Sequence, residues 1–514
     1  MPIFQQGSLN TTALVVPDLY VQIVPPQNLL LNGVPTNIIG VVGTASWGPK
    51  NVPTIVGSMA QYAANFGPIR ARKYDMGTHV ATAVQQGANN FRCVRVTDGT
   101  DTAATSTGVA TCITFAALYT GTLGATLQAS LAAGSKANTW KFVVGFPGQI
   151  GEVFDNITGT GNAFWVNLAA AINSGQSVGR GPSQLITATA AAGTTAPTAA
   201  TFTFTGGNDG TTTLTASVLV GTDGLTRTGM YALRGQGCSI GIVSDADDST
   251  AWTGIDAFGA SEGLYMMQPL PAGTGVAAAV TAKNTAGIDS WSTKMLHGDW
   301  IWWSDQVNNI IRLVSPQGFF AGRLANLSPE QSSLNKRVYG VVATQRSAMT
   351  ASQNAVYTAA DLQALVTGGI DVITTPVPGG NFFGVRVGHN ASSDPRVNGD
   401  NYTRMTNYIA ATLNAGMGLY IGQLINVALF RRITATLRSF FGNMLQQGML
   451  GSTDGSLPFS VICDVSNNPD SRTSLGYVQA DCQVKYQGIN EKFLVNVEGG
   501  QTVQVLRQQT QVAA

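Results

Sequence analysis

The sequence predicts a multidomain α/β and α+β protein: a doubly wound α/β core domain interrupted by a mainly β insertion, and an α+β C-terminal domain with extended terminal strand arms. Three observations predict it. Buried-strand patterns alternate with helix patterns on both sides of residues 100–228. Those residues are rich in Thr, Ala and Gly and are typical of short strands. Near the C-terminus, two long helix patterns precede further strand patterns.

The core segments alternate short strands with helices. The helix pattern SMAQYAANFG has Ser58 at the N-cap position and Gly67 as a stop signal. A second helix pattern ends at Gly87, and a strand pattern over residues 91–98 follows. The other expected elements are the strands NIIGVVG, VPTIVGS, CSIGIVSD, LYMMQPLP and DWIWWSD, and the helices over residues 251–260 and in GVAAAVTAKNTAG. This alternation favours a doubly wound sheet.

The insertion carries one helix pattern, AFWVNLAAAINSG, among strand patterns broken by Gly, Pro and Asn-Asp-Gly. Its residues 187–203 are of low complexity, so we expect a loop there. In the C-terminal domain, the second of the two helices repeats apolar residues at helical spacing. That apolar face consists of Phe430, Ile433, Leu437, Phe440 or Phe441, and Met444.

Both ends of the chain show period-two alternation of apolar and polar residues. Near the C-terminus the alternation over residues 493–497 is interrupted by Gly499 and Gly500 and then resumes. This pattern predicts a strand, a hinge and a second strand. Residues 1–24 hold similar short alternations. The residues expected in the strands of the two arms are Leu14, Val16, Tyr20, Val21, Ile23, Val503, Val505 and Leu506.

These patterns divide the chain into five predicted parts, of which the folded ones are long enough to bury their own cores. The parts are an N-terminal arm (1–24), an α/β core domain (25–99 and 229–345), an inserted mainly β outer domain (100–228), a C-terminal α+β domain (346–500) and a C-terminal arm (501–514).

The composition indicates a subunit of an assembly. The 28 Lys and Arg residues nearly balance 27 Asp and Glu, so no overall field favours nucleic acid or an acidic membrane. Charged residues make up only 11% of the chain, and a surface with so little charge favours association. The five cysteines include no CxxC pair, which argues against a zinc site. The first residues lack a basic segment followed by an apolar core, so we expect no signal peptide.

Candidate catalytic and metal-binding patterns have simpler interpretations. Ser261 lies in a GxSxG sequence, but a helix pattern precedes it and a strand follows, the reverse of a nucleophile elbow. The cluster around Asp245 has Thr250 where a calcium loop requires Gly, and a helix start capped by Ser249 or Thr250 explains it. No two of the three histidines lie at ligand spacing. We therefore expect no enzyme activity, metal or cofactor.

Several segments occur in an order shared with a known family. PDLYVQIV and NIIGVVGTASWGPKNVPTIVGSMAQYAANFG match its opening: a PGVY-like arm, a strand, a G-T-x-x-x-GP turn, a short strand and a helix ending in FG. GGIDVITTPVPGGNFFGVRVG, NYTRMTNYIAATL, LRSFFGNMLQQGMLGSTDG and FSVICDVSNNPDSRTSLGYVQADCQV match its C-terminal domain in order. PDLY in place of PGVY, and Val387 where many members have Thr, are departures. With these differences, the sequence resembles the contractile tail sheath proteins of myovirus-type bacteriophages.

The resemblance implies a structural subunit that polymerises as stacked hexameric rings around an inner tail tube. The sheath would contract to drive the tube through the host envelope during genome ejection. Strands of the terminal arms would complete a sheet in the C-terminal domains of neighbouring copies. The implied partners are other copies of this chain, the inner tail tube protein, and baseplate and tail terminator proteins, with no nucleic acid and no membrane insertion. The implied location is the virion tail, after assembly in the host cytoplasm.

The same resemblance gives the second C-terminal helix a role. No acidic residue lies between residues 401 and 453, but four arginines do: Arg404, Arg431, Arg432 and Arg438. Arg431 and Arg438 are seven residues apart and so lie on one side of the helix, with Arg432 beside Arg431. A solvated polar face would explain them equally well. Because the family's C-terminal domain lines the sheath lumen, we expect Arg431, Arg432 and Arg438 to face the tube.

Three alternatives stay open at the level of sequence. A secreted or surface adhesive, glycan-binding β-rich protein would have similar Thr- and Gly-rich segments. Phage-derived bacteriocins and injection systems use sheaths of the same architecture as phage tails. A hydrolase that uses Ser261 would need a histidine within reach of it.

Overall fold

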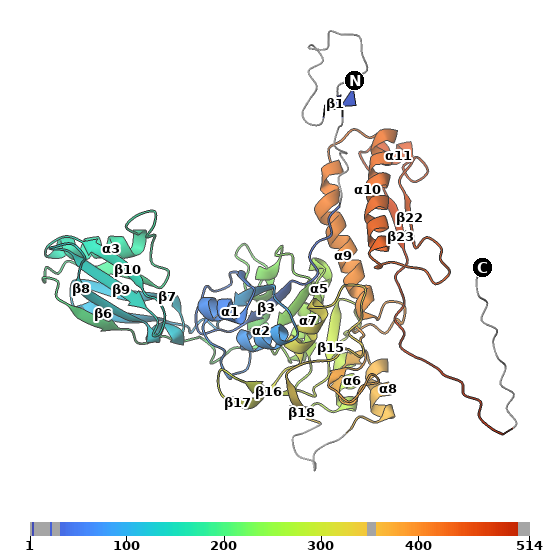
Figure 1. Ribbon diagram of the computed structural model, residues 1–514, viewed down its shortest axis with the longest axis horizontal. Helices are drawn as coiled ribbons and strands as arrows, with labels where there is room; N and C mark the ends of the chain where they lie inside the picture. The colour runs from blue at the N-terminus through green and yellow to red at the C-terminus, as the bar shows by residue number, and fades with distance from the viewer. Residues whose placement is uncertain (1–2, 5–20, 23–30, 347–355, 502–514) are drawn as a thin grey trace, which may run out of the picture.

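The computed structural model describes residues 3–4, 21–22, 31–346 and 356–501 of the chain. It shows a mixed α/β protein with one mostly parallel sheet and several small antiparallel sheets. In Figure 1 the central sheet lies between two outlying parts, the antiparallel sheets with α3 on one side and the long helices α9 and α10 on the other. The expected division into five parts, with its boundaries, stays a prediction.

The central sheet has seven strands in the order β19-β15-β14-β13-β3-β5-β4. All neighbours run parallel except β4, which is antiparallel to β5. The strands are β3 (Ile39–Gly43), β4 (Thr54–Val56), β5 (Phe91–Arg95), β13 (Ile240–Val243), β14 (Tyr265–Pro269), β15 (Thr293–Leu296) and β19 (Ile370–Asp371). The accompanying helices are α1 (Met59–Phe66), α2 (Met76–Gln85), α5 (Ser249–Glu262), α6 (Val276–Thr285), α7 (Gln317–Ala325) and α8 (Ala359–Thr367).

Apolar cores lie on both faces of this sheet because successive strand residues point to opposite sides. Val41 and Ile242 belong to the core that includes residues of α1, α2 and α7. Their neighbours Val42 and Val243 belong to the other core, with residues of α5. That second core also takes residues of α4 (Ala216–Val220) and of the 3₁₀ helix η3 (Gly229–Leu233). The strands read as continuous apolar runs for this reason.

Helix ends follow the predicted signals with one correction. The Ser58 side chain accepts from the amide of Gln61 at the start of α1, and Gly67 follows its last residue, as predicted. The N-cap of α5 is Asp248, whose carboxylate accepts from the amide of Thr250. The prediction of Ser249 or Thr250 as the cap was wrong by one or two residues, because the carboxylate immediately before the helix reaches its free amide first.

The segment DWIWWSD is not part of the central sheet, contrary to the prediction. It forms β16 (Ile301–Asp305), the middle strand of an antiparallel sheet with β17 (Ile310–Val314) and β18 (Val341–Thr344). The parallel strand at this point of the chain is β15, whose pattern was missed because it contains a lysine, Lys294, that is fully buried. The next sheet strand, β19, follows residue 345, where the core domain was expected to end.

The insertion forms two antiparallel sheets around one apolar core, with the orders β10-β9-β8-β12 and β11-β7-β6. Its elements are β6 (Ala103–Val109), β7 (Ile113–Thr120), η2 (Thr122–Thr126), β8 (Gln128–Ala133), β9 (Trp140–Gly145), β10 (Glu152–Ile157), α3 (Asn162–Ser174), β11 (Ile186–Ala190) and β12 (Ala200–Thr203). The loop expected over 187–203 is therefore wrong at both ends. Ala188 and Phe202 are buried in that core, which stabilises strands in spite of the repetitive composition.

The C-terminal part contains α9 (Asp400–Gly416), the 3₁₀ helix η5 (Met417–Tyr420), α10 (Val427–Gln446), α11 (Asp470–Thr473), β22 (Phe459–Ile462) and β23 (Asp481–Val484). The predicted apolar face of α10 is confirmed, with Phe440 and Phe441 both buried. Two further pairs are β1 (Ile3–Phe4) with β2 (Val21–Gln22) and β20 (Ile373–Thr374) with β21 (Gly384–Val385). Among the helices in the described ranges, none is both long and apolar enough to cross a membrane.

Candidate assembly interface

At the carboxyl end of β13, the edge of the sheet where α/β proteins usually bind ligands is occupied by the side chain of Gln317. Nε2 of Gln317 donates to the carbonyls of Val243 (2.9 Å) and Met267 (2.8 Å), and Oε1 accepts from the amide of Asp245 (2.8 Å). The Asp245 carboxylate lies 3.1 Å from Nε2 of His79. These contacts explain Asp245 as part of a buried network instead of a calcium loop.

The GxSxG sequence is a helix end. Ser261 is in the last turn of α5, and its hydroxyl donates to the carbonyl of Phe258 at 2.9 Å. Gly263 follows in the left-handed conformation, with φ of 69°, as the helix C-cap. In the part of the chain that the structure describes, no group of three or more His, Cys, Asp or Glu side chains could hold a metal ion.

The sheet of β22 and β23 has a free edge on each strand. The two strands pair antiparallel, with Phe459 opposite Val484 and Ile462 opposite Asp481, and neither has a second neighbour within the described ranges. Val461 anchors one face in the same apolar core as α10. A two-stranded sheet exposes unpaired backbone groups at both edges, and these can accept a further strand.

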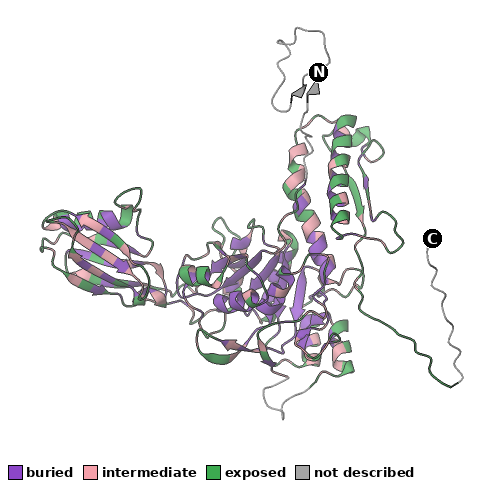
Figure 2. Ribbon diagram, in the orientation of Figure 1, coloured by how far each residue is buried: buried purple, intermediate pink, exposed green. Residues whose placement is uncertain are grey.

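The chain beyond β23 ends in an exposed apolar stretch. Phe493, Leu494 and Val497 are each more than 80% exposed, and Val495 is 60% exposed. Residues 487–500 form no helix or strand, so the strand predicted over 493–497 is absent from the isolated chain. Figures 1 and 2 show this stretch leaving the body as an exposed trace. Its alternating side chains can form a strand only against a partner, because nothing in the described chain supplies a ladder.

The predicted hinge and arm residues fall mostly at the limits of the described chain. Gly499 and Gly500 lie at the end of the exposed stretch, and a Cβ on Gly499 would meet nothing within 4 Å. Val21 lies in β2 and pairs in parallel with Ile3 of β1. The other predicted arm residues, Leu14, Val16, Tyr20, Ile23, Val503, Val505 and Leu506, lie outside the described residues.

The N-terminal segment 31–36 lies along α9. Leu31 is buried in the core that α9 and α10 share. The amide of Val34 donates to the hydroxyl of Thr412 at 3.2 Å, and the carbonyl of Thr36 accepts from the guanidinium of Arg404 at 3.5 Å. Leu31, where the continuous described chain begins, therefore lies beside Gly416 at the end of α9 that is remote from the central sheet (Figure 1).

The three arginines predicted to face the tube all lie on the exposed side of α10. Arg431, Arg432 and Arg438 are exposed, and Arg432 donates to Oε1 of Gln423 at 2.8 Å. Arg404, the fourth arginine of this region, is instead buried and donates to the carbonyls of Leu327, Ser328 and Thr36. Of these four arginines, the three of α10 are exposed to an external partner and Arg404 is not.

A buried charge cluster at the base of α9 was missed by the sequence analysis. Lys294 contacts the carboxylates of Asp371 and Asp400, and all three side chains are fully buried. Burial alone would lower the pKa of the Lys294 ammonium, but the two carboxylates raise it above its ordinary value. The sequence signal that could have indicated this cluster is the single lysine of STKMLHG, which has Thr293 before it and Met295 and Leu296 after it.

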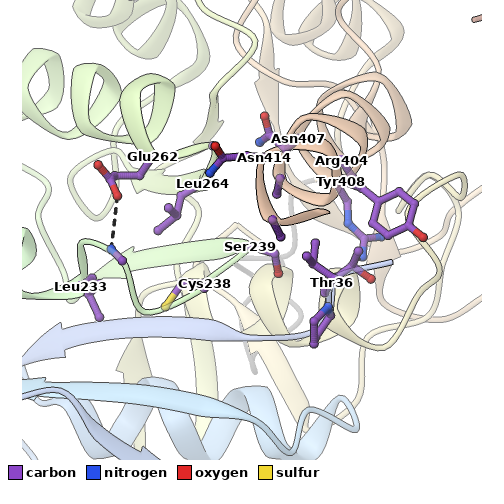
Figure 3. Close-up of a pocket in the computed structure, with 17 residues that line it drawn as sticks. Thr36, Leu233, Cys238, Ser239, Glu262, Leu264, Arg404, Asn407, Tyr408 and Asn414 are labelled. Carbon is purple, nitrogen blue, oxygen red and sulfur yellow. Dashed lines mark hydrogen bonds between the residues drawn. The ribbon is translucent and has the colours of Figure 1, made fainter. Parts of the chain in front are cut away.

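A cavity of about 400 Å³ lies between α9 and the segments 34–36, 233–239 and 262–264. Figure 3 shows Arg404, Asn407 and Tyr408 of α9 on one side, with Glu262, Leu264 and Cys238 around it. Burial raises the pKa of the Cys238 thiol to about 12, which makes it a poor nucleophile at neutral pH. Of the other polar groups in its lining, the Ser239 hydroxyl donates to the carbonyl of Ile38 at 3.1 Å and the Glu262 carboxylate pairs with Arg234.

Comparisons with known proteins bear on the fold. No family model and no curated protein matches the sequence. Among solved structures, the sheath tail protein of Listeria innocua matches with a TM-score of 0.61 at 12% identity, over 85% of this chain and 90% of that one. The sheath tail protein of Desulfitobacterium hafniense matches with a TM-score of 0.57 at 12% identity, over 87% and 93%.

Sheaths of injection systems match over still more of the chain. The sheath complex of the extracellular contractile injection system PVC, in its contracted state, has a TM-score of 0.54 at 10% identity and covers 95% of this chain and 99% of its own. The contracted helical sheath of the anti-feeding prophage gives 0.55 at 11% identity, over 94% and 99%. This chain therefore has the fold of contractile tail sheath proteins.

Proposed function

We propose that this protein is the sheath subunit of a contractile tail. It polymerises as stacked hexameric rings around an inner tube and contracts to drive that tube through a host envelope. Two complementary features of the described residues carry the proposal: an exposed apolar stretch at 493–497 that pairs with no described strand, and a β22–β23 sheet whose two edges no other described strand covers. The fold shared with sheath proteins over most of the chain supports it.

Terminal arms of one copy would add strands to the β22–β23 sheet of its neighbours. Main-chain hydrogen bonds would give this addition its affinity, and the alternating apolar side chains its register. Each added strand also covers an edge that would otherwise pair unspecifically. The arms, continuing through Val503, Val505 and Leu506 at one end and Leu14 to Ile23 at the other, would join rings into a continuous lattice.

The work of contraction would come from a difference in contacts between two packings of the same subunits. The sequence contains no GxxxxGK phosphate loop through which a nucleotide could supply it. The extended sheath would be a kinetically trapped state, released when a baseplate disturbs the first ring. A tail terminator would end the polymer at the other side.

The tube contact would be the exposed arginine face of α10. Arg431 and Arg438 lie two turns apart, and no acidic residue lies between residues 401 and 453. Exposed ion pairs contribute only about 0–1 kcal/mol each. Weak pairs repeated over many subunits would hold the tube during assembly and still release it on contraction.

Electron microscopy of the purified full-length chain tests the proposal. Tubes or rings of uniform width are expected, because subunits joined head to tail through the same interface form either a closed ring or a growing helical polymer. A protein that stays monomeric over a wide range of concentration and salt would contradict it. Particles from the producing cells separate the two origins: DNA-filled heads on the tails indicate a virion, and headless particles a bacteriocin or injection system.

A further inference from the structure

The tail segment, residues 488–501, makes one side-chain hydrogen bond or ion pair with the rest of the described chain. Just before it, Nδ2 of Asn401 donates to the carbonyl of Gln487 at 3.1 Å, and Nε2 of Gln487 donates to the carbonyls of Gly448 and Leu450. The next polar side-chain contact along the chain is made by Glu491, whose Oε1 lies 2.7 Å from Nε2 of His389. From Lys492 to Gln501 every residue is exposed.

We propose that the contact between His389 and Glu491 is a latch that holds the start of the tail segment against the body. Breaking this contact would lengthen the free part of the C-terminal end of the chain. A carboxylate can only accept, so Nε2 of His389 donates in this contact. While the latch is closed, the free part of the tail segment begins at Lys492. This is seven residues before Gly499, where the sequence predicts a hinge.

His389 is a rigid half of the latch. Its side chain is only 8% exposed. Its backbone bridges to Gly399, and its carbonyl accepts from Nζ of the buried Lys294 at 2.9 Å. The backbone at His389 is therefore held by the same cluster that fixes the base of α9, and the buried ring offers one donor to the tail segment.

The Glu491 side of the latch is less buried than the His389 side. Its side chain is 40% exposed. A groove of about 570 Å³ lies between the segment 488–493 and residues 330–336, and residues of both line it. Glu330 and Lys336 line that groove. Among the described residues, neither forms an ion pair with the Glu491 carboxylate. Few contacts other than the latch would have to break for the segment to lift away.

When the latch opens, Gln487 becomes the last residue held by hydrogen bonds to the body, and residues 488–491 become free. Four extended residues add roughly 13–14 Å of reach, at about 3.3–3.6 Å per residue. On the proposed sheath function, this reserve would let an arm stay paired with its neighbour while contraction changes the distance between the two subunits. The latch itself is a property of the single chain and does not depend on that function.

Trypsin cleavage after Lys492 in the native full-length chain tests the latch, because a protease needs several free residues on each side of the bond it cuts. His389→Ala leaves the cleaved sequence unchanged and removes the donor. We expect cleavage after Lys492 to become roughly threefold to tenfold faster, the range for loss of one net hydrogen bond. Cleavage after Lys485, next to β23, should stay unchanged.

The matched control is His297→Ala, another buried histidine, whose ring contacts Tyr357 and not the arm. Equal cleavage after Lys492 in wild type and His389→Ala would overturn the latch, and so would equal acceleration in both histidine variants. Assembled sheaths of the His389→Ala variant should contract at a lower urea concentration than those of the His297→Ala variant. Equal urea thresholds would show that the extra length of free chain plays no part in contraction. If no sheath forms from the wild-type chain, the proposed function fails while the proteolysis still decides the latch.

Discussion

Nζ of Lys294 lies 2.8 Å from Oδ1 of Asp400, and both side chains are fully buried. Lys294 belongs to β15 of the central sheet, and Asp400 is the first residue of α9. Asp400 also accepts from the hydroxyl of Tyr265 at 2.6 Å, and Asp371 lies 2.6 Å from the same ammonium. The base of α9 is thus fixed to the sheet by a paired and hydrogen-bonded charge cluster.

Breaking this cluster should destabilise the fold strongly. Lys294→Met leaves two buried carboxylates without their cation, and we expect a loss of about 3–5 kcal/mol in the free energy of unfolding, measured by urea denaturation. The control is Arg227→Met, which breaks a pair with Asp223 whose two side chains are 48% and 38% exposed, and should cost less than about 1 kcal/mol. Similar losses for the two variants would show that the buried cluster contributes no more than a surface pair.

The C-terminal arm should be needed for assembly but not for folding. Deleting residues 501–514 removes no part of the described cores, so the circular dichroism spectrum and Tm should be unchanged while tubes disappear from micrographs. Val503→Pro should also reduce tube formation, because proline cannot donate to an intersubunit ladder. Val503→Thr keeps the amide and the β-branch and serves as the control. Normal tubes from the truncated chain would rule out the arm as a connector.

Reversing the charge of the α10 arginine face should weaken the tube contact. With Arg431→Glu and Arg438→Glu together, we expect fewer sheaths around co-expressed tubes, while polymerisation without tubes continues. Each pair is worth only about 0–1 kcal/mol, so the effect should grow at low salt and with sheath length. The matched control is Arg396→Glu, at an 85% exposed side chain away from α10. Sheathed tubes as abundant as with the wild type would exclude this face.

His297 should make stability depend on pH. Burial, and then the nearby Arg346 guanidinium, lower its pKa to about 4. The unfolded imidazole binds a proton below about 6.5, so the unfolded state gains protons first as pH falls. Stability should therefore decrease between pH 6.5 and 4, by up to about 3 kcal/mol from this residue. His297→Gln should flatten the pH dependence of the urea midpoint over this range, and an unchanged slope would contradict the shift.

Local signals determined much of the secondary structure. Ser58 and Gly67 bound α1, and the 3.6-residue spacing from Phe430 to Met444 sets the buried face of α10. The helix before Ser261 and the strand after it identified the GxSxG sequence as a helix end. These features depend on hydrogen bonds and side chains within a few residues of each other, which a single sequence displays directly.

Tertiary contacts decided what the local pattern could not. The strand at Lys294 was missed because a lysine in a buried strand requires carboxylates more than 70 residues away, from β19 and α9. DWIWWSD has the pattern of a core strand, yet it pairs antiparallel with β17 and β18, since apolar alternation does not specify the partner sheet. Phe493 to Val497 alternate like a strand but stay unpaired in the single chain. A sequence determines that such a segment can form a strand, whereas only the folded chain shows that it pairs with no other strand of the described ranges, because ladder formation requires a second strand brought alongside.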